Sequence, residues 1–278
     1  MAFLMAKFSK WQSLRISLFI SLISMSYCAG SQSLTLVDSA TVNSPDLISI
    51  DQSDNIYISD VKGNVYKFGS NLNKPLVYSP DKPAKITFLE TWQGLRIFCF
   101  YRDIQEFALL NRFLNSSENY LFDLPEIQFA VAATTSFDNN LWILDQPSMS
   151  LLKYNISSNS IEFTKPLDLT FQKPFSEIIL FREYQNRIYL IDKQNGIFIF
   201  DNLGNFISNE KLKTSASISF FENYLYYLEN GRLIFKNLYS SGSYNIDLPK
   251  NRTPNQVVRN SMGIYLLEGE SVYFYRIN

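Results

Sequence analysis

Short hydrophobic runs, broken by clusters of Asn, Asp, Ser, Gly and Pro, follow one another along the chain from residue 31 to its end. Runs of this kind, rich in Ile, Val, Leu, Phe and Tyr, are typical of β-strands separated by turns. Apolar residues at the i, i+3, i+4, i+7 spacing of an amphipathic helix form no stripe of helical length. The pattern therefore predicts an all-β protein.

A two-strand unit recurs six times along this region. Each copy has a turn rich in Asn or Gly, a strand with a central aromatic residue, a tight turn and a second strand. The aromatic residues are Tyr57, Phe98, Trp142, Tyr189, Tyr226 and Tyr265. They are 41, 44, 47, 37 and 39 residues apart. A period near forty with four short strands per unit is typical of β-propellers, so we predict one six-bladed propeller over residues 31–278.

The sixth unit ends at Asn278 after its third strand, which would leave one blade a strand short. An unpaired strand edge favours aggregation. The segment Ser33–Val37 has the pattern of a spare strand at the other end of the chain. We therefore expect it to pair beside Val272–Tyr275 and to close the ring.

The segment Pro45–Asp60 resembles one NHL-type propeller repeat, and residues 136–154 and 186–204 resemble it less closely. This resemblance implies a propeller that binds other molecules, because NHL-like propellers are mostly interaction modules. It implies no catalytic residues.

The first thirty residues have the pattern of a signal peptide. Lys7, Lys10 and Arg15 precede the apolar run Ile16–Met25, and small residues follow. This run is short for a membrane helix, although an N-terminal anchor is the alternative. Cys28 admits a second alternative, a lipid anchor, but the residue before it is a bulky tyrosine. We expect an exported protein, periplasmic or associated with the outer membrane, with no transmembrane segment after residue 31.

Composition excludes several chemistries. The chain has no histidine, so it cannot build a Ser-His-Asp triad or a histidine-ligated metal site. Beyond the leader, Cys99 is the single cysteine, which excludes an internal disulfide and a cysteine-rich zinc site. The net charge of −1 gives no basic footprint for nucleic acid. We expect no catalytic residues and no cofactor.

A carboxylate follows five of the six aromatic anchors by three residues. These acids are Asp60, Asp145, Asp192, Glu229 and Glu268. In a propeller they would recur around one face and could hold a hard cation such as calcium. The preferred interpretation is structural, because Asp at a strand end bonds the backbone amides of its own turn.

Phe171, Phe175 and Tyr184 lie in loop-like segments and are the predicted anchors for a partner, although packing beneath the loops is the alternative. We expect a non-catalytic scaffold of the bacterial envelope that binds a protein partner. One hypothesis is that it belongs to an outer-membrane export complex, and a more specific form of this hypothesis is a plug-like subunit of a type 9 secretion translocon. The alternative function is a carboxylate-dependent enzyme that cleaves carbohydrates or lactones, with or without calcium.

Overall fold

Nearly every hydrophobic run of the sequence forms a strand in the structure, a computed structural model that describes residues 33–278 except 70, 168–170, 172–174, 176 and 213–216. The predicted leader, residues 1–30, lies outside the described residues. The sole helical turn among them is η1, Arg102–Ile104. No helix in these ranges is long and apolar enough to cross a membrane. The all-β prediction is confirmed.

The described strands form six four-stranded antiparallel sheets, the blades of a propeller. The inner strands are β2 (Pro45–Ile50), β6 (Phe88–Glu90), β10 (Ala130–Thr135), β14 (Ile178–Tyr184), β18 (Ile218–Phe221) and β22 (Gln256–Arg259). The second strands are β3 (Ile56–Asp60), β7 (Arg96–Tyr101), β11 (Leu141–Asp145), β15 (Arg187–Asp192), β19 (Tyr224–Glu229) and β23 (Gly263–Glu268). The third strands are β4 (Val65–Phe68), β8 (Glu106–Asn111), β12 (Ser150–Asn155), β16 (Gly196–Asp201), β20 (Arg232–Asn237) and β24 (Ser271–Ile277). The outer strands are β5 (Leu76–Tyr78), β9 (Ser117–Leu121), β13 (Ser160–Pro166), β17 (Phe206–Glu210), β21 (Ser243–Asp247) and β1 (Leu34–Thr41).

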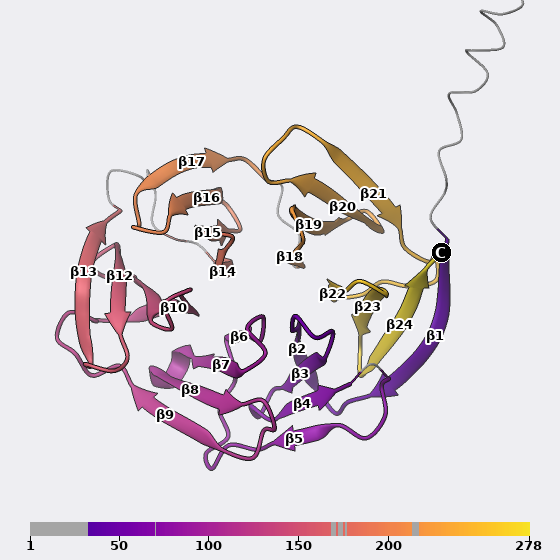
Figure 1. Cartoon of the computed structure of the whole chain (residues 1–278), viewed down its shortest axis with the longest axis horizontal. Helices are drawn as coiled ribbons and strands as arrows, with labels where there is room; N and C mark the ends of the chain where they lie inside the picture. The colour runs from indigo at the N-terminus through magenta and orange to yellow at the C-terminus, as the bar shows by residue number, and fades with distance from the viewer. Residues whose placement is uncertain (1–32, 70, 168–170, 172–174, 176, 213–216) are drawn as a thin grey trace, which may run out of the picture. The chain divides into compact units, whose positions relative to one another are not determined.

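The six blades form a closed ring (Figure 1). Each inner strand contacts the inner strands of both neighbouring blades, and β22 contacts β2. We number the blades from the one that begins with β2, so that blade 6 contains β22, β23, β24 and β1. The predicted six-bladed propeller is confirmed.

Six apolar clusters, one between each pair of neighbouring blades, form the core. Each second strand packs one face against the preceding blade and the other face against the following blade. Both faces are therefore buried, which explains why these strands are continuous apolar runs and do not alternate. All six predicted aromatic anchors are buried there. The outer strand β13 instead alternates between exposed and half-buried residues, as a strand with one face in water should.

A repeated side-chain pattern shapes the turns. Asp60 accepts hydrogen bonds from the backbone N–H groups of Lys62 and Asn64, and the Asn64 amide donates to its other oxygen. Asp51 and Asp201 make the same bonds in their own turns, each with an Asn four residues later. In this Asp-x-x-x-Asn pattern, side-chain hydrogen bonds take the place of backbone hydrogen bonds at the point where the chain reverses.

The N-terminal strand β1 pairs with β24 and gives blade 6 its fourth strand (Figure 1). Leu36 lies opposite Tyr275, a bulge follows at Val37, and pairing continues to Thr41 opposite Ser271. The strand is longer than the predicted Ser33–Val37. The hydrophobic pattern stops at Val37, but an outer strand requires only backbone hydrogen bonds and tolerates polar side chains.

Candidate functional site

One end of the ring carries most of the turns within the blades, and the opposite end carries the second-to-third turns and the connections between blades. Because the strands of a blade are antiparallel, its first-to-second and third-to-fourth turns lie at the same end. We call this end the hairpin face, and the opposite end the connection face. Hydrogen bonds join the first hairpins of different blades: Gln52 N–H donates to the Trp92 carbonyl at 3.3 Å, and Ser261 Oγ donates to Asp54 Oδ2 at 2.7 Å. These bonds hold the hairpins in fixed relative positions.

A cleft of about 460 Å³ opens on the hairpin face between blades 1, 2, 3 and 4. Its volume is in the range of small-molecule sites. Residues from the first hairpins and inner strands of all four blades line it, among them Gln52, Trp92, Gln93, Phe137, Glu183 and Asn186. Phe137 stands at the hairpin tip of blade 3 and is 82% exposed. Such exposure of a phenyl ring beside a cleft makes this position the first candidate for ligand contact.

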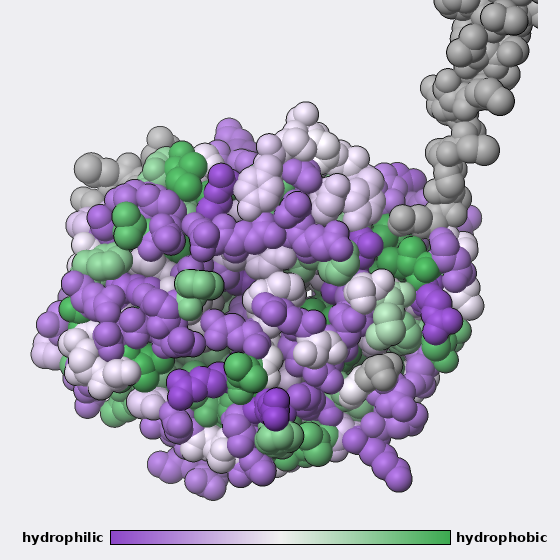
Figure 2. All heavy atoms as spheres, in the orientation of Figure 1, coloured by the Kyte–Doolittle hydropathy of each residue, from purple (hydrophilic) through white to green (hydrophobic). Residues whose placement is uncertain are grey.

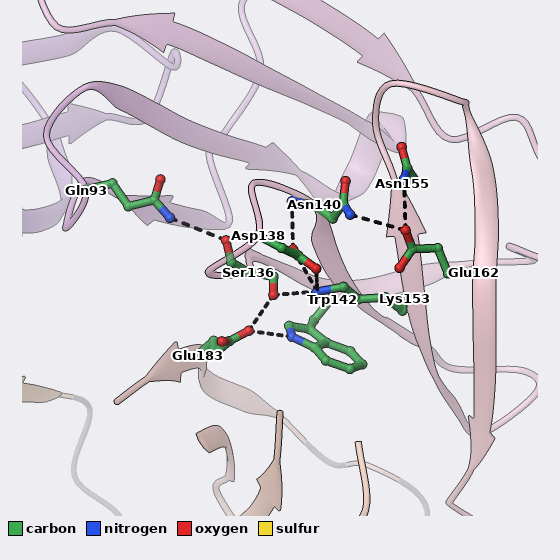
Figure 3. Close-up of polar contacts among 9 residues, drawn as sticks. All are labelled: Gln93, Ser136, Asp138, Asn140, Trp142, Lys153, Asn155, Glu162 and Glu183. Carbon is green, nitrogen blue, oxygen red and sulfur yellow. Dashed lines mark hydrogen bonds and ion pairs between the residues drawn. The ribbon is translucent and has the colours of Figure 1, made fainter. Parts of the chain in front are cut away.

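A polar network supports the wall of the cleft between blades 3 and 4 (Figure 3). Glu183 Oε2 accepts hydrogen bonds from Ser136 Oγ at 2.6 Å and from the Trp142 indole N–H at 2.7 Å. Lys153 Nζ donates to Ser136 Oγ and lies 2.9 Å from the Asp138 carboxylate. The Lys153 side chain is only 5% exposed and its ammonium lies 4.5 Å from the centroid of the Trp142 ring. The network therefore fixes the orientation of Glu183.

The contact between Ser136 and Lys153 raises the question of a serine nucleophile activated by lysine. Such a pair needs a neutral amine with a free lone pair to take the hydroxyl proton. Here the Lys153 ammonium is bonded to the Asp138 carboxylate, and the Ser136 proton points to Glu183. Burial alone would raise the pKa of Asp138, but hydrogen bonds from Lys153 and from the Asn140 N–H outweigh it and lower that pKa. The geometry is that of an ion pair that positions residues, not of a nucleophile.

A second ion pair closes the cleft on the side of the central channel. Arg182 Nε lies 2.5 Å from Glu90 Oε2, and both side chains are almost fully buried. Glu90 Oε1 accepts the backbone N–H of Trp92 at 3.0 Å. Both oxygens of Glu90 are thus engaged, and its charge is compensated by Arg182.

The channel itself offers little space. The cavity along the inner strands measures about 120 Å³ and is lined mainly by aliphatic side chains such as Ile48, Leu89 and Val257. This volume lies well below the range of ligand pockets. The cleft, and not the channel, is therefore the candidate site.

Large hydrophobic side chains also project from hairpin tips elsewhere on the hairpin face. Besides Phe137 these are Leu95, Phe113, Leu203, Tyr239 and Met262. Together with Phe137 they come from five blades, and they lie between the first and second or the third and fourth strands. Figure 2 shows one side of the molecule, where hydrophilic residues predominate and hydrophobic ones occur in small separate groups. Exposed apolar side chains on rigid hairpins are candidates for the anchors of a protein interface.

The five predicted acids all lie at the opposite end, on the connection face, where each is the last residue of a second strand. Asp145 accepts the backbone N–H groups of Phe129 and Ser148, and Asp192 accepts those of Gln194 and Asn195. Glu268 accepts the backbone N–H of Thr253 at 2.6 Å and the Arg252 guanidinium. Asp60 makes the turn described above, and Glu229 has no side-chain hydrogen bond to a described residue. Asp60, Asp145 and Asp192 thus bond their own turns, as the structural interpretation expects, whereas Glu268 bonds a different segment. No group of three acids, cysteines or histidines with metal-binding geometry occurs among the described residues.

The three predicted aromatic anchors lie in the core. Phe171 and Phe175 are 4% and 7% exposed, and the Phe171 ring stacks on Phe198 at 3.9 Å between centroids. Tyr184 is 4% exposed, and burial raises its pKa to about 12. Its hydroxyl donates to the Glu222 carbonyl at 2.8 Å. The expectation that these rings face outward is wrong, because the loop that carries Phe171 and Phe175 packs them against blades 3 and 4.

Sequence reasoning missed the residues of the cleft. Phe137 is the single aromatic residue in the polar turn Ser136–Asn140, and an isolated aromatic residue in a polar turn is a signal of exposure. Lys153 lies directly opposite Trp142 in the paired strands β11 and β12, which a register assignment would have shown. The convergence of Gln52, Trp92 and Asn186 depends on the ring geometry and has no local signal.

The comparisons with known proteins show the fold. Virginiamycin B lyase from Staphylococcus aureus is 11% identical, with a TM-score of 0.62 over 88% of this chain and 100% of that chain. A catalytically inactive histidine-to-alanine variant of that lyase with quinupristin is 16% identical, with a TM-score of 0.57 over 85% of this chain and 82% of that chain. The Neurospora crassa Pan2 WD40 domain is 10% identical, with a TM-score of 0.58 over 88% of this chain and 96% of that chain.

No protein-family model matches the chain, and no curated protein matches it by sequence. The resemblance to NHL repeats therefore rests on the sequence pattern of Pro45–Asp60 and residues 136–154 and 186–204, whereas the propeller fold is shown by the structure and its neighbours. At these identities a shared fold indicates no shared activity.

Proposed function

We propose that this chain is a non-catalytic binding protein of the bacterial cell envelope, and that it docks a protein partner on its hairpin face. The observation that carries the proposal is the set of exposed hydrophobic tips on that face. The hairpins of Phe113, Leu203 and Tyr239 are each shaped by a side chain that accepts the backbone N–H of the tip residue. A pre-formed surface loses little conformational entropy on binding, which favours affinity. Export, suggested by the leader pattern, is part of the proposal, as is membership of an export complex.

Two observations speak for binding over catalysis. The histidine-to-alanine variant of the lyase is described as catalytically inactive, and this chain has no histidine that could fill such a role. The carboxylates nearest the cleft, Glu90 and Glu183, are held by Arg182 and by the pair Ser136 and Trp142. A general acid would need a free, protonated carboxyl group at this position.

Affinity purification from gently solubilised envelopes tests this proposal. We expect a stable protein partner to co-purify with the wild type. The amount of partner that co-purifies with the double variant Phe113→Ser/Leu203→Ser should be at least about tenfold lower, the loss typical of a hot-spot anchor. The matched control is Val61→Ser/Ile104→Ser, which removes exposed apolar residues from the connection face. A protein that migrates alone, or equal loss in both double variants, would contradict the proposal.

A further inference from the structure

The polar groups of the cleft divide into those already bonded and those free to meet a ligand. Gln185 is of the first kind, since its amide donates to the Glu222 carbonyl and its oxygen accepts the Tyr239 hydroxyl. Several others have no hydrogen-bond partner among the described residues: Glu183 Oε1, Gln93 Oε1, the Trp92 indole N–H, and the side-chain amides of Gln52 and Asn186. The cleft thus offers both donors and acceptors.

The charges around the cleft compensate one another almost completely. Glu90 is paired with Arg182, and Asp138 with Lys153. Glu183 remains, and Ser136 and Trp142 donate hydrogen bonds to one of its oxygens. Glu183 is thus the single carboxylate lining the cleft without an ion-pair partner among the described residues, and its second oxygen can accept hydrogen bonds from hydroxyl groups. The remaining groups suit a neutral ligand that both donates and accepts hydrogen bonds.

Aromatic surface lies beside these groups. The Phe137 ring is exposed at the rim, and the half-buried Trp92 ring is fixed by an edge contact to Tyr184 at 5.5 Å between centroids. An aromatic face next to planar amides and a carboxylate is complementary to a sugar ring, whose C–H faces are apolar and whose hydroxyls point outward in its plane.

We propose that the cleft is a binding site for a neutral carbohydrate of one or two sugar units. Phe137 stacks on one face of the ring, and Glu183, Asn186 and Trp92 bond its hydroxyls. The side chains converge from four separate hairpins on one point, which suits a compact ring better than an extended peptide. The site stands independently of the protein-docking proposal, because its polar groups belong to the cleft and not to the other tips.

Isothermal titration calorimetry of the purified protein with methyl glycosides of glucose, galactose, mannose, xylose and N-acetylglucosamine tests this site. We expect at least one to bind with a Kd of about 1 mM or tighter, an affinity typical of a few hydrogen bonds and one stacking contact. Phe137→Ala should weaken that binding by about tenfold or more.

A matched pair of glycine variants separates recognition from folding. Asn186 and Asn139 both have positive φ, 60° and 64°, in neighbouring hairpins, so glycine fits both turns. Asn186→Gly should weaken sugar binding by about tenfold, whereas Asn139→Gly, whose side chain lies outside the cleft, should bind as the wild type does. Phe113→Ser/Leu203→Ser should also bind sugar normally, which separates this site from the docking surface.

Three results would overturn the inference. The first is no heat of binding from any of the five glycosides up to about 20 mM, an affinity too weak to be a site. The second is equal binding by Asn186→Gly and Asn139→Gly. The third is binding of Nα-acetyl-lysine methylamide, whose side-chain ammonium is free, with no binding of the glycosides. That result would make the cleft a site for cationic side chains.

Discussion

The ion pair between Glu90 and Arg182 joins the inner strand of blade 2 to that of blade 4, and a substitution at either position leaves a buried charge. The side chains are 9% and 12% exposed, and their closest N–O distance is 2.5 Å. At an effective dielectric of about 20 the attraction at this distance is about 7 kcal/mol before desolvation is subtracted. Loss of one partner of a buried pair typically costs about 3–5 kcal/mol, because the other charge stays without compensation.

A double-mutant cycle measures this coupling. Glu90→Gln retains an oxygen for the Trp92 N–H, and Arg182→Met retains the volume of the side chain. Each single variant should lose about 3–5 kcal/mol of unfolding free energy, whereas the double variant should lose only about 1–2 kcal/mol. Urea unfolding followed by circular dichroism gives the three values, and thermal midpoints should fall by about 2–4 °C per kcal/mol.

Additive losses in the cycle would refute the reasoning. Additivity within about 0.5 kcal/mol would mean that the two charges do not interact in the folded protein. A double variant that is no more stable than either single variant would likewise place the loss in packing and not in electrostatics.

Other predictions follow from the turns, the buried lysine and the N-terminal strand. Asp60→Ala should lose about 2–4 kcal/mol because several hydrogen bonds disappear, whereas Asp60→Asn should lose less than half of that by urea unfolding. The pKa of Asp138 is lowered in the folded protein, so its carboxylate stabilises the fold at pH values above its ordinary pKa of 3.8, and this stabilisation is lost as the pH falls through the lowered pKa. The free energy of unfolding should therefore fall less on acidification in Asp138→Asn than in the wild type. Deletion of residues 33–41 should expose the edge of β24, lower the thermal midpoint and promote aggregation in light scattering, whereas an unchanged midpoint would show that β1 contributes no stability.

The fold could be predicted from the sequence because its determinants are local and repeated. Tyr57 and Trp142 each occupy the second position of a strand that is buried between two blades, so their spacing reflects the blade period directly. The fourth strand of blade 6 could also be assigned by counting strands, because blade 6 has three strands at the C-terminal end and the hydrophobic run that begins at Leu34 belongs to no other blade.

The candidate site could not be predicted in the same way. Whether a loop aromatic such as Phe171 faces inward depends on the space between two blades, and the sequence does not show that space. Gln52 and Asn186 of the cleft lie more than a hundred residues apart in the sequence, and they meet only because the ring brings blades 1 and 4 to one opening. Turn acids such as Asp192 could be assigned, because their partners lie within three residues.

Site-specific photo-cross-linking in the native cell tests the central claim most directly, namely that the hairpin face docks a protein partner. A photoreactive phenylalanine analogue is placed at Phe113, Leu203 or Tyr239 on the hairpin face, and at Val61 or Ile104 on the connection face as controls. We predict one and the same covalent adduct from the three hairpin-face positions and none from the controls. Adducts from Val61 and Ile104 but not from Phe113, Leu203 and Tyr239 would contradict the account.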